Sequence, residues 1–114
     1  MERRELGDIG EAMASAFLLE RGYEVIGKQV RIGRGEIDLV AKEGDEIVFV
    51  EVKTRRSEAY GAPEESVTEA KLEQLHRLAQ MYIGAKRYAG PWRIDVIAIS
   101  LGSQDPIYHI RGIG

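Results

Sequence analysis

The segment "GEIDLVAKEGDEIVFVEVKTRR", from Gly35 to Arg56, contains the clearest structural signals in this chain. Two apolar, β-branched runs flank Gly44-Asp45, and such runs are typical of strands. A glycine in the first position suits a two-residue type II′ turn, where φ is positive. We therefore predict a β-hairpin with strands over Glu36–Ala41 and Glu46–Thr54.

This hairpin would bring acidic side chains together. With a two-residue turn, Asp38 lies directly opposite Glu51, and Glu36 lies opposite Lys53. Directly opposed residues have Cβ atoms about 5 Å apart, and like charges in such positions destabilise a sheet. The register thus predicts two carboxylates in close contact.

The second strand of the hairpin is apolar on both faces. Because side chains alternate along a strand, one face carries three valines and the other carries Ile47 and Phe49 beside Glu51 and Lys53. The three valines are Val48, Val50 and Val52. A strand of this kind is usually central in its sheet and covered on both sides.

Burial adds a desolvation cost to the repulsion between Asp38 and Glu51. A divalent cation between the carboxylates would reverse that cost, and hard oxygen ligands suit Mg²⁺ or Mn²⁺. Lys53 would extend from the same face toward a phosphate or water at the metal. A second interpretation stays open, in which Lys53 forms an ordinary cross-strand ion pair with Asp38 or Glu36.

The segment before the hairpin predicts a helix, a strand and a turn. Apolar residues recur at helical spacing between Glu2 and Arg21, and Gly22 supplies a left-handed stop. The apolar set is Leu6, Ile9, Met13, Ala16 and Phe17. A strand over Tyr23–Val30 and a glycine-rich basic turn over Arg31–Gly35 follow.

The segment after the hairpin predicts a second helix and two strands. A polar connection over Arg55–Ser66 leads to a capping box of Ser66 and Glu69, and the helix runs to about Lys86. Strands follow over Trp92–Ser100 and Ile107–Ile110. The order α-β-β-β-α-β-β predicts an α/β sandwich in which helices flank a mixed central sheet.

Composition excludes several classes of protein. The length of 114 residues fits one domain over 1–114, and the absence of cysteine excludes disulfides and thiolate metal sites. No apolar run approaches the roughly 20 residues of a membrane span, and acids interrupt the N-terminal segment where a signal peptide would be apolar. We expect a cytoplasmic protein with no membrane partner. The net charge of −3 gives little support to nucleic-acid binding.

Several long motifs resemble a known family. They are "GDIGEAMASAFLLERGYEVI", "GEIDLVA", "VFVEVKTRRS", "YGAPEESVTEAK" and "RIDVIAI", and together they cover nearly the whole chain. An Asp on one strand and Glu-x-Lys on the next is similar to the active-site pattern of the restriction-endonuclease-like, or PD-(D/E)XK, nuclease superfamily. The wider context resembles the YraN-like family of small bacterial proteins.

The resemblance implies a restriction-endonuclease-like fold and an active-site layout similar to that of archaeal Holliday-junction resolvases. It further implies Mg²⁺- or Mn²⁺-dependent hydrolysis of phosphodiesters in DNA, with branched or structured DNA of repair or recombination as the expected substrate. Two cuts per junction would imply a homodimer. The superfamily often has proline before the Asp, whereas Ile37 precedes Asp38 here, as in the resolvase-like group.

By this resemblance Asp38, Glu51 and the Val52 carbonyl would ligate the metal. Lys53 would orient the attacking water or neutralise charge that develops on the phosphate. Glu11 has two interpretations: helical spacing alone places it on the solvent side, about 140° from Leu6, whereas the resemblance places it at the site.

The remaining polar residues divide into a basic rim and structural pairs. Four arginines would contact phosphates that flank the cut, or form a solubilising rim: Arg31, Arg34, Arg55 and Arg56. The resemblance also implies phosphate binding or support of the site by Lys71. Asp95 is expected to pair with Arg93 or Lys71. No role is expected for His76 and His109, and Leu72, Leu75 and Tyr82 are expected in the core.

Two other functions stay open. The chain could be a nucleic-acid-binding module that keeps the fold without turnover. It could also be an interaction module of a DNA-processing assembly, in which the ion pairs are merely structural. The intact set of Asp38, Glu51 and Lys53 favours the nuclease.

Overall fold

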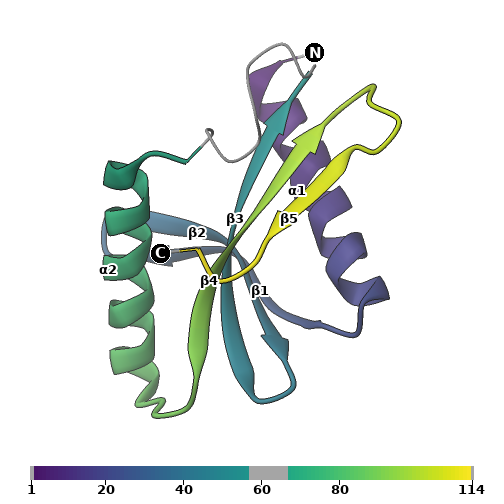
Figure 1. The fold of residues 1–114 in the computed structure, drawn as a ribbon. Coiled ribbons are helices and arrows are strands. Elements are labelled where there is room, and N and C mark those ends of the chain that lie inside the picture. Colours follow the sequence, from purple (N-terminus) through teal and green to yellow (C-terminus); the bar gives the residue numbers. More distant parts are fainter. Residues whose placement is uncertain (1, 57–66, 114) are drawn as a thin grey trace.

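A computed structural model describes residues 2–56 and 67–113, and in these residues five strands form one mixed sheet in the order β1-β2-β3-β4-β5 (Figure 1). The elements are α1 (Arg3–Glu20), β1 (Glu24–Ile32), β2 (Gly35–Glu43), β3 (Glu46–Arg55), α2 (Glu69–Lys86), β4 (Trp92–Ser100) and β5 (Ile107–Ile110). The predicted order and the predicted α/β class are confirmed. β3 and β4 are parallel, and the other neighbouring strands are antiparallel.

The ends of the helices follow their local sequence. Gly22 has φ +86° after α1, as predicted for a left-handed stop. The predicted cap Ser66 lies outside the described residues, and the structure shows Thr68 as the N-cap of α2, its side chain accepting a hydrogen bond from the Lys71 N–H. None of the described helices is long and apolar enough to cross a membrane.

The two helices cover opposite faces of the sheet (Figure 1). On the α1 face, Ala14 and Leu18 pack with residues of the central strands, including Val48 and Val50. On the α2 face, Leu75 packs in a cluster that includes Ile47, Phe49 and Ile94. Leu72 and Tyr82 pack at the margin of this second cluster, so the predicted core stripe of α2 is confirmed.

The hairpin register is confirmed over most of its length. Glu43 pairs with Glu46 and Leu39 with Val50, and Gly44 has φ +62° as a type II′ turn requires. The ladder ends at Leu39, however, so the direct pairing of Asp38 with Glu51 is wrong. The Val52 N–H donates instead to the Asp38 carboxylate at 2.8 Å.

The predicted pairing of Glu36 with Lys53 is also wrong. Glu36 pairs with Arg31 across the β1–β2 ladder, and the β2–β3 ladder does not reach it. The two central strands therefore part where the acidic side chains begin, which opens the end of the sheet.

An irregularity at Gln29 and Asp38 accompanies this opening. In a regular strand Ile37 and Leu39 would share a face, yet Ile37 packs in the α2-side cluster and Leu39 in the α1-side cluster. Gln29 has φ +47°, an uncommon value for a non-glycine residue, within the strand that pairs with β2. Local breaks in alternation re-aim side chains and occur often beside functional sites.

The buried side of α1 differs from the predicted apolar stripe. Gly10, Ala14 and Leu18 face the sheet, whereas Ile9 and Ala16 are exposed. Small residues allow the helix to lie close to β3, and a Cβ atom on Gly10 would overlap the Thr54 side chain. The close approach brings the N-terminal half of α1 against the open end of the sheet.

We predict that Gly10→Ala destabilises the protein by about 1–3 kcal/mol, because the added methyl group meets Thr54 at a packed contact. Gly7→Ala on the same helix is the matched control, since a Cβ atom there meets no atom within 4 Å. The control should gain about 0.5–1 kcal/mol from the higher helix propensity of alanine. Urea unfolding of both variants measures the difference, and equal changes would show that α1 does not pack closely at Gly10.

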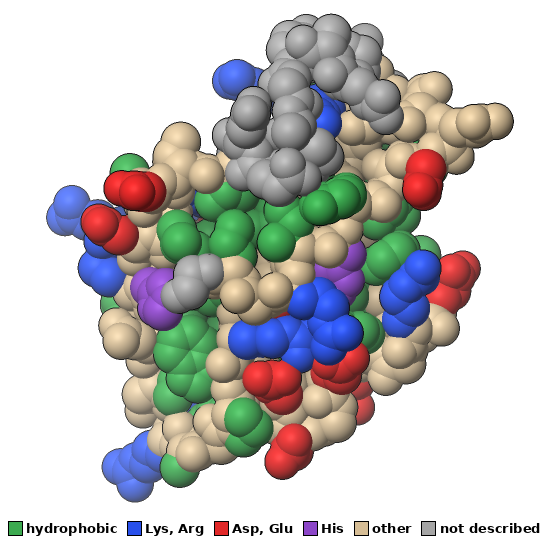
Figure 2. Space-filling model, in the orientation of Figure 1, with side chains coloured by type: hydrophobic (Ala, Val, Ile, Leu, Met, Phe, Trp, Pro, Cys, Tyr) green, Lys and Arg blue, Asp and Glu red, His purple; other side chains and the backbone are tan. Residues whose placement is uncertain are grey.

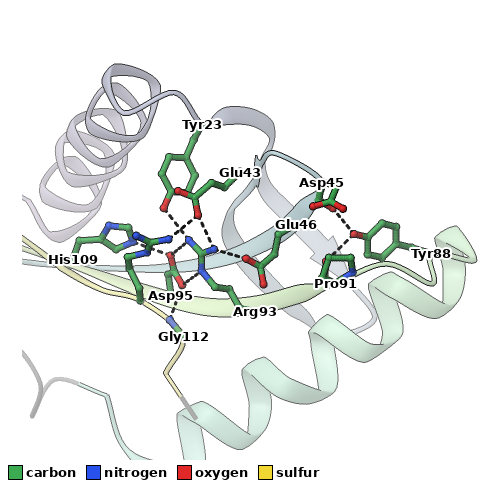
Figure 3. Close-up of polar contacts among 11 residues, drawn as sticks. Tyr23, Glu43, Asp45, Glu46, Tyr88, Pro91, Arg93, Asp95, His109 and Gly112 are labelled. Atoms are coloured by element: carbon green, nitrogen blue, oxygen red, sulfur yellow. Dashed lines mark hydrogen bonds and ion pairs between the residues drawn. The ribbon is translucent and has the colours of Figure 1, made fainter.

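A polar network joins β4, β5 and the segment that follows β5 (Figure 3). Asp95 is fully buried and accepts from Arg93 Nε at 2.9 Å and from the Gly112 N–H at 2.9 Å; His109 Nε2 lies 2.8 Å from its Oδ2. Burial alone would raise the pKa of Asp95, but these hydrogen bonds hold the pKa below its usual value. The predicted pair with Arg93 is confirmed, while the expectation that His109 has no role is wrong.

Arg93 extends this network to the hairpin turn. Its guanidinium contacts Glu43 at 2.8 Å and Glu46 at 2.6 Å, and Arg111 contacts Glu43 at 2.7 Å. Basic and acidic side chains accordingly lie together on the face shown in Figure 2. Each charge in this network has an opposite charge beside it, so its role is to hold the elements together.

Candidate functional site

A cavity of about 580 Å³ lies where β2 and β3 part. All the predicted site residues except Arg55 and Arg56 line it: Glu11, Arg31, Arg34, Asp38, Glu51, Val52, Lys53 and Lys71. Residues from α1, the β1–β2 hairpin, β3 and α2 thus meet at one place. We call it the carboxylate cavity.

Glu51 is the buried acid of this cavity, with only 4% of its surface exposed. Lys53 Nζ lies 3.5 Å from Glu51 Oε2, and Lys71 Nζ lies 3.4 Å from the same oxygen. One ammonium comes from the same strand and the other from α2. The charge of Glu51 is therefore balanced by two cations in the structure.

Asp38 is half-buried and forms no ion pair among the described residues. Burial raises its pKa to about 7, and the charge of Glu51 and a hydrogen bond between the two carboxyl groups act in the same direction. The hydrogen bond from the Val52 N–H acts in the opposite direction. Asp38 is thus the uncompensated acid of the pair.

Glu11 lies on α1 and is half-buried at the wall of the cavity. Burial raises its pKa, a hydrogen bond with Gln29 lowers it, and the charges of nearby acids, including Glu51, raise it. Glu11 therefore lies at the cavity and not on the solvent side that helical spacing indicated, whereas its role at the site stays a prediction. The close packing of Gly10 on Thr54 explains the difference.

The arginines of the predicted rim lie at two places. Arg31 and Arg34, near the tip of the β1–β2 hairpin, line the carboxylate cavity. Arg55 and Arg56 line a neighbouring cavity of about 410 Å³ together with Arg3, Leu6 and Thr54. Arg3, Leu6 and Thr54 line both cavities, so the two adjoin.

Sequence reasoning missed Arg3 and Gln74, which also line the carboxylate cavity. Helical spacing could have indicated both residues. Arg3 precedes Glu11 by two helical turns, and Gln74 follows Lys71 by one turn, so each shares a helix face with a predicted site residue.

The donors of the cavity fit a hard divalent cation. No three His, Cys, Asp or Glu side chains in 2–56 and 67–113 gather closely enough to hold a metal ion by themselves. Mg²⁺, however, usually keeps several waters and binds one or two carboxylates. A strand residue directs its N–H and C=O to the same neighbour, so the Val52 carbonyl shares the edge on which its N–H meets Asp38.

The comparisons with known sequences identify one family. The model of the uncharacterised protein family UPF0102 matches residues 10–99. A UPF0102 protein of Moorella thermoacetica is 46% identical over 99% of this chain and 95% of its own length. A UPF0102 protein of Roseiflexus castenholzii is 49% identical over 88% of this chain and 82% of its own length. The prediction of the YraN-like family is thereby confirmed.

A comparison with solved structures supports the predicted fold. A repair endonuclease from Pyrococcus abyssi superposes on 90% of this chain with a TM-score of 0.54 and 20% sequence identity. This chain covers 41% of the length of that protein. At such low identity the match shows a shared fold alone, which agrees with the predicted α/β architecture of helices around a mixed sheet.

Proposed function

This chain belongs to the uncharacterised protein family UPF0102, and we propose that it is a metal-dependent endonuclease that hydrolyses phosphodiester bonds in DNA. The observation that carries the proposal is the pair of Asp38 and Glu51 in a cavity that arginine and lysine side chains also line. The fold shared with a repair endonuclease supports it.

The electrostatics of the pair favour a bound cation. Two lysines balance the charge of Glu51. The pKa of Asp38, however, is raised by burial and by the charge of Glu51, so the ionised pair is unfavourable without a further positive charge. Acids with a pKa perturbed in this way are typical of functional sites, where a ligand compensates the buried charge. We assign Asp38, Glu51 and the Val52 carbonyl as the residues that hold Mg²⁺ or Mn²⁺.

The side chains around the pair have separate roles in this proposal. A bound divalent cation would polarise the scissile phosphate and lower the pKa of a bound water. Lys53, with 40% of its side chain exposed, reaches into the cavity to orient the water or neutralise charge on the phosphate. In this proposal Lys71 keeps Glu51 in place from α2, and Glu11, whose pKa is raised by burial, would accept a proton.

The proposed substrate is branched or otherwise structured DNA of repair or recombination. Arginine and lysine side chains line the carboxylate cavity from three directions: Arg3 on α1, Arg31 and Arg34 on the hairpin, and Lys71 on α2. Phosphate contacts of this kind supply affinity for DNA that does not depend on the base sequence. A four-way junction requires paired cuts, so a homodimer is part of the proposal.

One observation favours a second candidate function. Glu51 already has two lysine partners, and an ion-pair cluster of this kind can persist without metal. The chain would then be a nucleic-acid-binding module without turnover. Such a module would bind DNA equally well with and without Mg²⁺.

The test is a panel of linear, flap, Y-form and four-way DNA, each incubated with Mg²⁺, with Mn²⁺ and with chelator. We expect cleavage of at least one structured DNA with metal and none with chelator. Glu51→Gln is the matched loss-of-site control, since it keeps the side-chain shape and removes the charge. Binding without cleavage under every condition would favour the non-catalytic module.

A further inference from the structure

We infer that the smaller cavity is a second phosphate subsite, which holds the phosphate next to the one at the carboxylates. Its lining consists of Arg3, Leu6, Thr54, Arg55 and Arg56, and we call it the arginine cavity. The inference rests on the proposed function for the identity of the ligand, a nucleic-acid strand.

The charges of the two cavities differ in kind. The carboxylate cavity combines basic side chains with the acids Glu11, Glu36, Asp38 and Glu51, so a phosphate there needs a cation beside it. Among residues 2–56 and 67–113, the lining of the arginine cavity includes three arginines and no acid. Arginine binds phosphate through paired N–H groups, so this cavity suits a phosphate without metal.

Secondary structure adds to the positive potential of the arginine cavity. Arg3 is the first residue of α1, and the N-cap Glu2 makes no side-chain capping bond to the N–H groups of the first turn, which have no partner within the helix. A helix of this length carries partial positive charge at its N-terminus. That end of α1 lies beside the C-terminal end of β3, where Arg55 and Arg56 are found (Figure 1).

The position of Arg55 is fixed by β4. Its Nε donates to the Ser100 hydroxyl at 3.0 Å, and its carbonyl accepts from the Leu101 N–H at 2.9 Å. Ser100 is only 6% exposed, so this anchor belongs to the folded sheet. An arginine held in this way loses less conformational entropy when it binds an anion.

Shared walls connect the subsite to the proposed cleavage site. Arg3, Leu6 and Thr54 line both cavities, and Arg31 and Arg34 line the carboxylate cavity from the hairpin. A strand that crosses the carboxylates would therefore meet cations before and after the cleaved bond. This arrangement favours bonds within a strand over free mononucleotides.

The test compares two adjacent arginines. Arg3→Ala removes a lining residue of both cavities, whereas Arg4→Ala makes the same change at an exposed neighbour that lines neither. Fluorescence anisotropy measures binding of a labelled DNA duplex in EDTA over a series of KCl concentrations. Melting curves establish that both variants are folded, and Arg3→Lys tests whether a cation without the paired N–H groups restores binding in part.

We expect Arg3→Ala to weaken binding about tenfold and to lower the salt slope by about one, as for one lost phosphate contact. Arg55→Ala combined with Arg56→Ala should lower the slope in the same way, and Arg4→Ala should leave it unchanged. Equal slopes for Arg3→Ala and Arg4→Ala would overturn the subsite, as would a wild-type protein that binds no DNA.

The metal-free assay separates this inference from the proposed catalysis. A wild-type protein that binds DNA with the Arg3-dependent slope but cleaves nothing would contradict the proposed endonuclease and support the subsite. A protein that cleaves DNA with equal Arg3 and Arg4 slopes would support the endonuclease and contradict the subsite.

Discussion

Lys53→Ala is expected to lower turnover on a cleavable DNA by about 10²–10³-fold, while metal affinity stays largely intact. The two effects separate because the proposed metal ligands are carboxylates and a carbonyl, whereas the Lys53 ammonium lies 3.5 Å from Glu51 Oε2 and reaches the open cavity. Lys71 contacts the same oxygen and keeps Glu51 partly neutralised in the variant.

Single-turnover cleavage and calorimetric Mn²⁺ titration of the same preparations measure the two effects. Lys28→Ala is the matched control, since Lys28 is an exposed strand lysine outside the residues that line the cavity. Full cleavage activity of Lys53→Ala would remove this residue from the mechanism. A loss of metal binding as large as the loss of turnover would instead make Lys53 a support of the metal site.

Asp38→Asn is expected to abolish both cleavage and Mg²⁺-induced stabilisation without any loss of stability in the metal-free protein. The asparagine oxygen can still accept the hydrogen bond from the Val52 N–H, and the repulsion with Glu51 disappears. Wild-type protein should gain RT ln(1 + [M]/Kd) on adding metal, about 2.7 kcal/mol at a hundredfold excess over Kd.

The stability difference between these proteins should depend on pH. In the folded protein the pKa of Asp38 is about 7, above its usual value of 3.8. The contribution of this raised pKa to the free energy of unfolding is therefore complete below pH 3.8, and it is lost as the pH rises through 7. At pH 5 wild-type Asp38 is neutral and resembles asparagine. At pH 8 it is ionised, and the metal-free variant should be the more stable by at least about 1.4 kcal/mol.

Thermal and urea unfolding at pH 5 and pH 8, with Mg²⁺ or with EDTA, measure all of these quantities. A purely structural ion-pair cluster predicts the reverse pattern. The variant would then lose stability at pH 8, and Mg²⁺ would change neither protein. That pattern would contradict the metal-site assignment.

The sequence predicted the elements well because local chemistry determined them. Gly44 fixed the hairpin turn, Gly22 ended α1, and the β-branched runs defined β3 and β4 with little error at their ends. The predicted site residues on β2 and β3 share one cavity for the same reason: the register of the hairpin follows from its two-residue turn.

The failures of prediction concern tertiary contacts. Strict alternation places Asp38 opposite Glu51, but the ladder ends at Leu39 and a reversal of faces near Gln29 turns Asp38 toward the Val52 N–H. No local sequence pattern predicts a positive φ at a glutamine. Helical spacing likewise placed Glu11 toward solvent, because the packing of Gly10 on Thr54 involves residues far apart in the chain.

The polar network around Asp95 was only partly predictable. An acid within the apolar run of β4 required a cation, and Arg93 two residues earlier was an available partner on the same face. The contribution of His109 depends on β5 pairing beside β4, which sequence spacing does not reveal. Long-range pairing therefore sets the limit of what could be predicted for this site.

The most direct measurement is the anomalous scattering of Mn²⁺ in crystals of the wild-type protein soaked with the metal. We predict a peak in contact with the carboxylates of Asp38 and Glu51 and with the Val52 carbonyl, and no such peak in crystals of Asp38→Asn. A wild-type map without a peak at these oxygens, at Mn²⁺ concentrations that support cleavage, would contradict the proposed metal site.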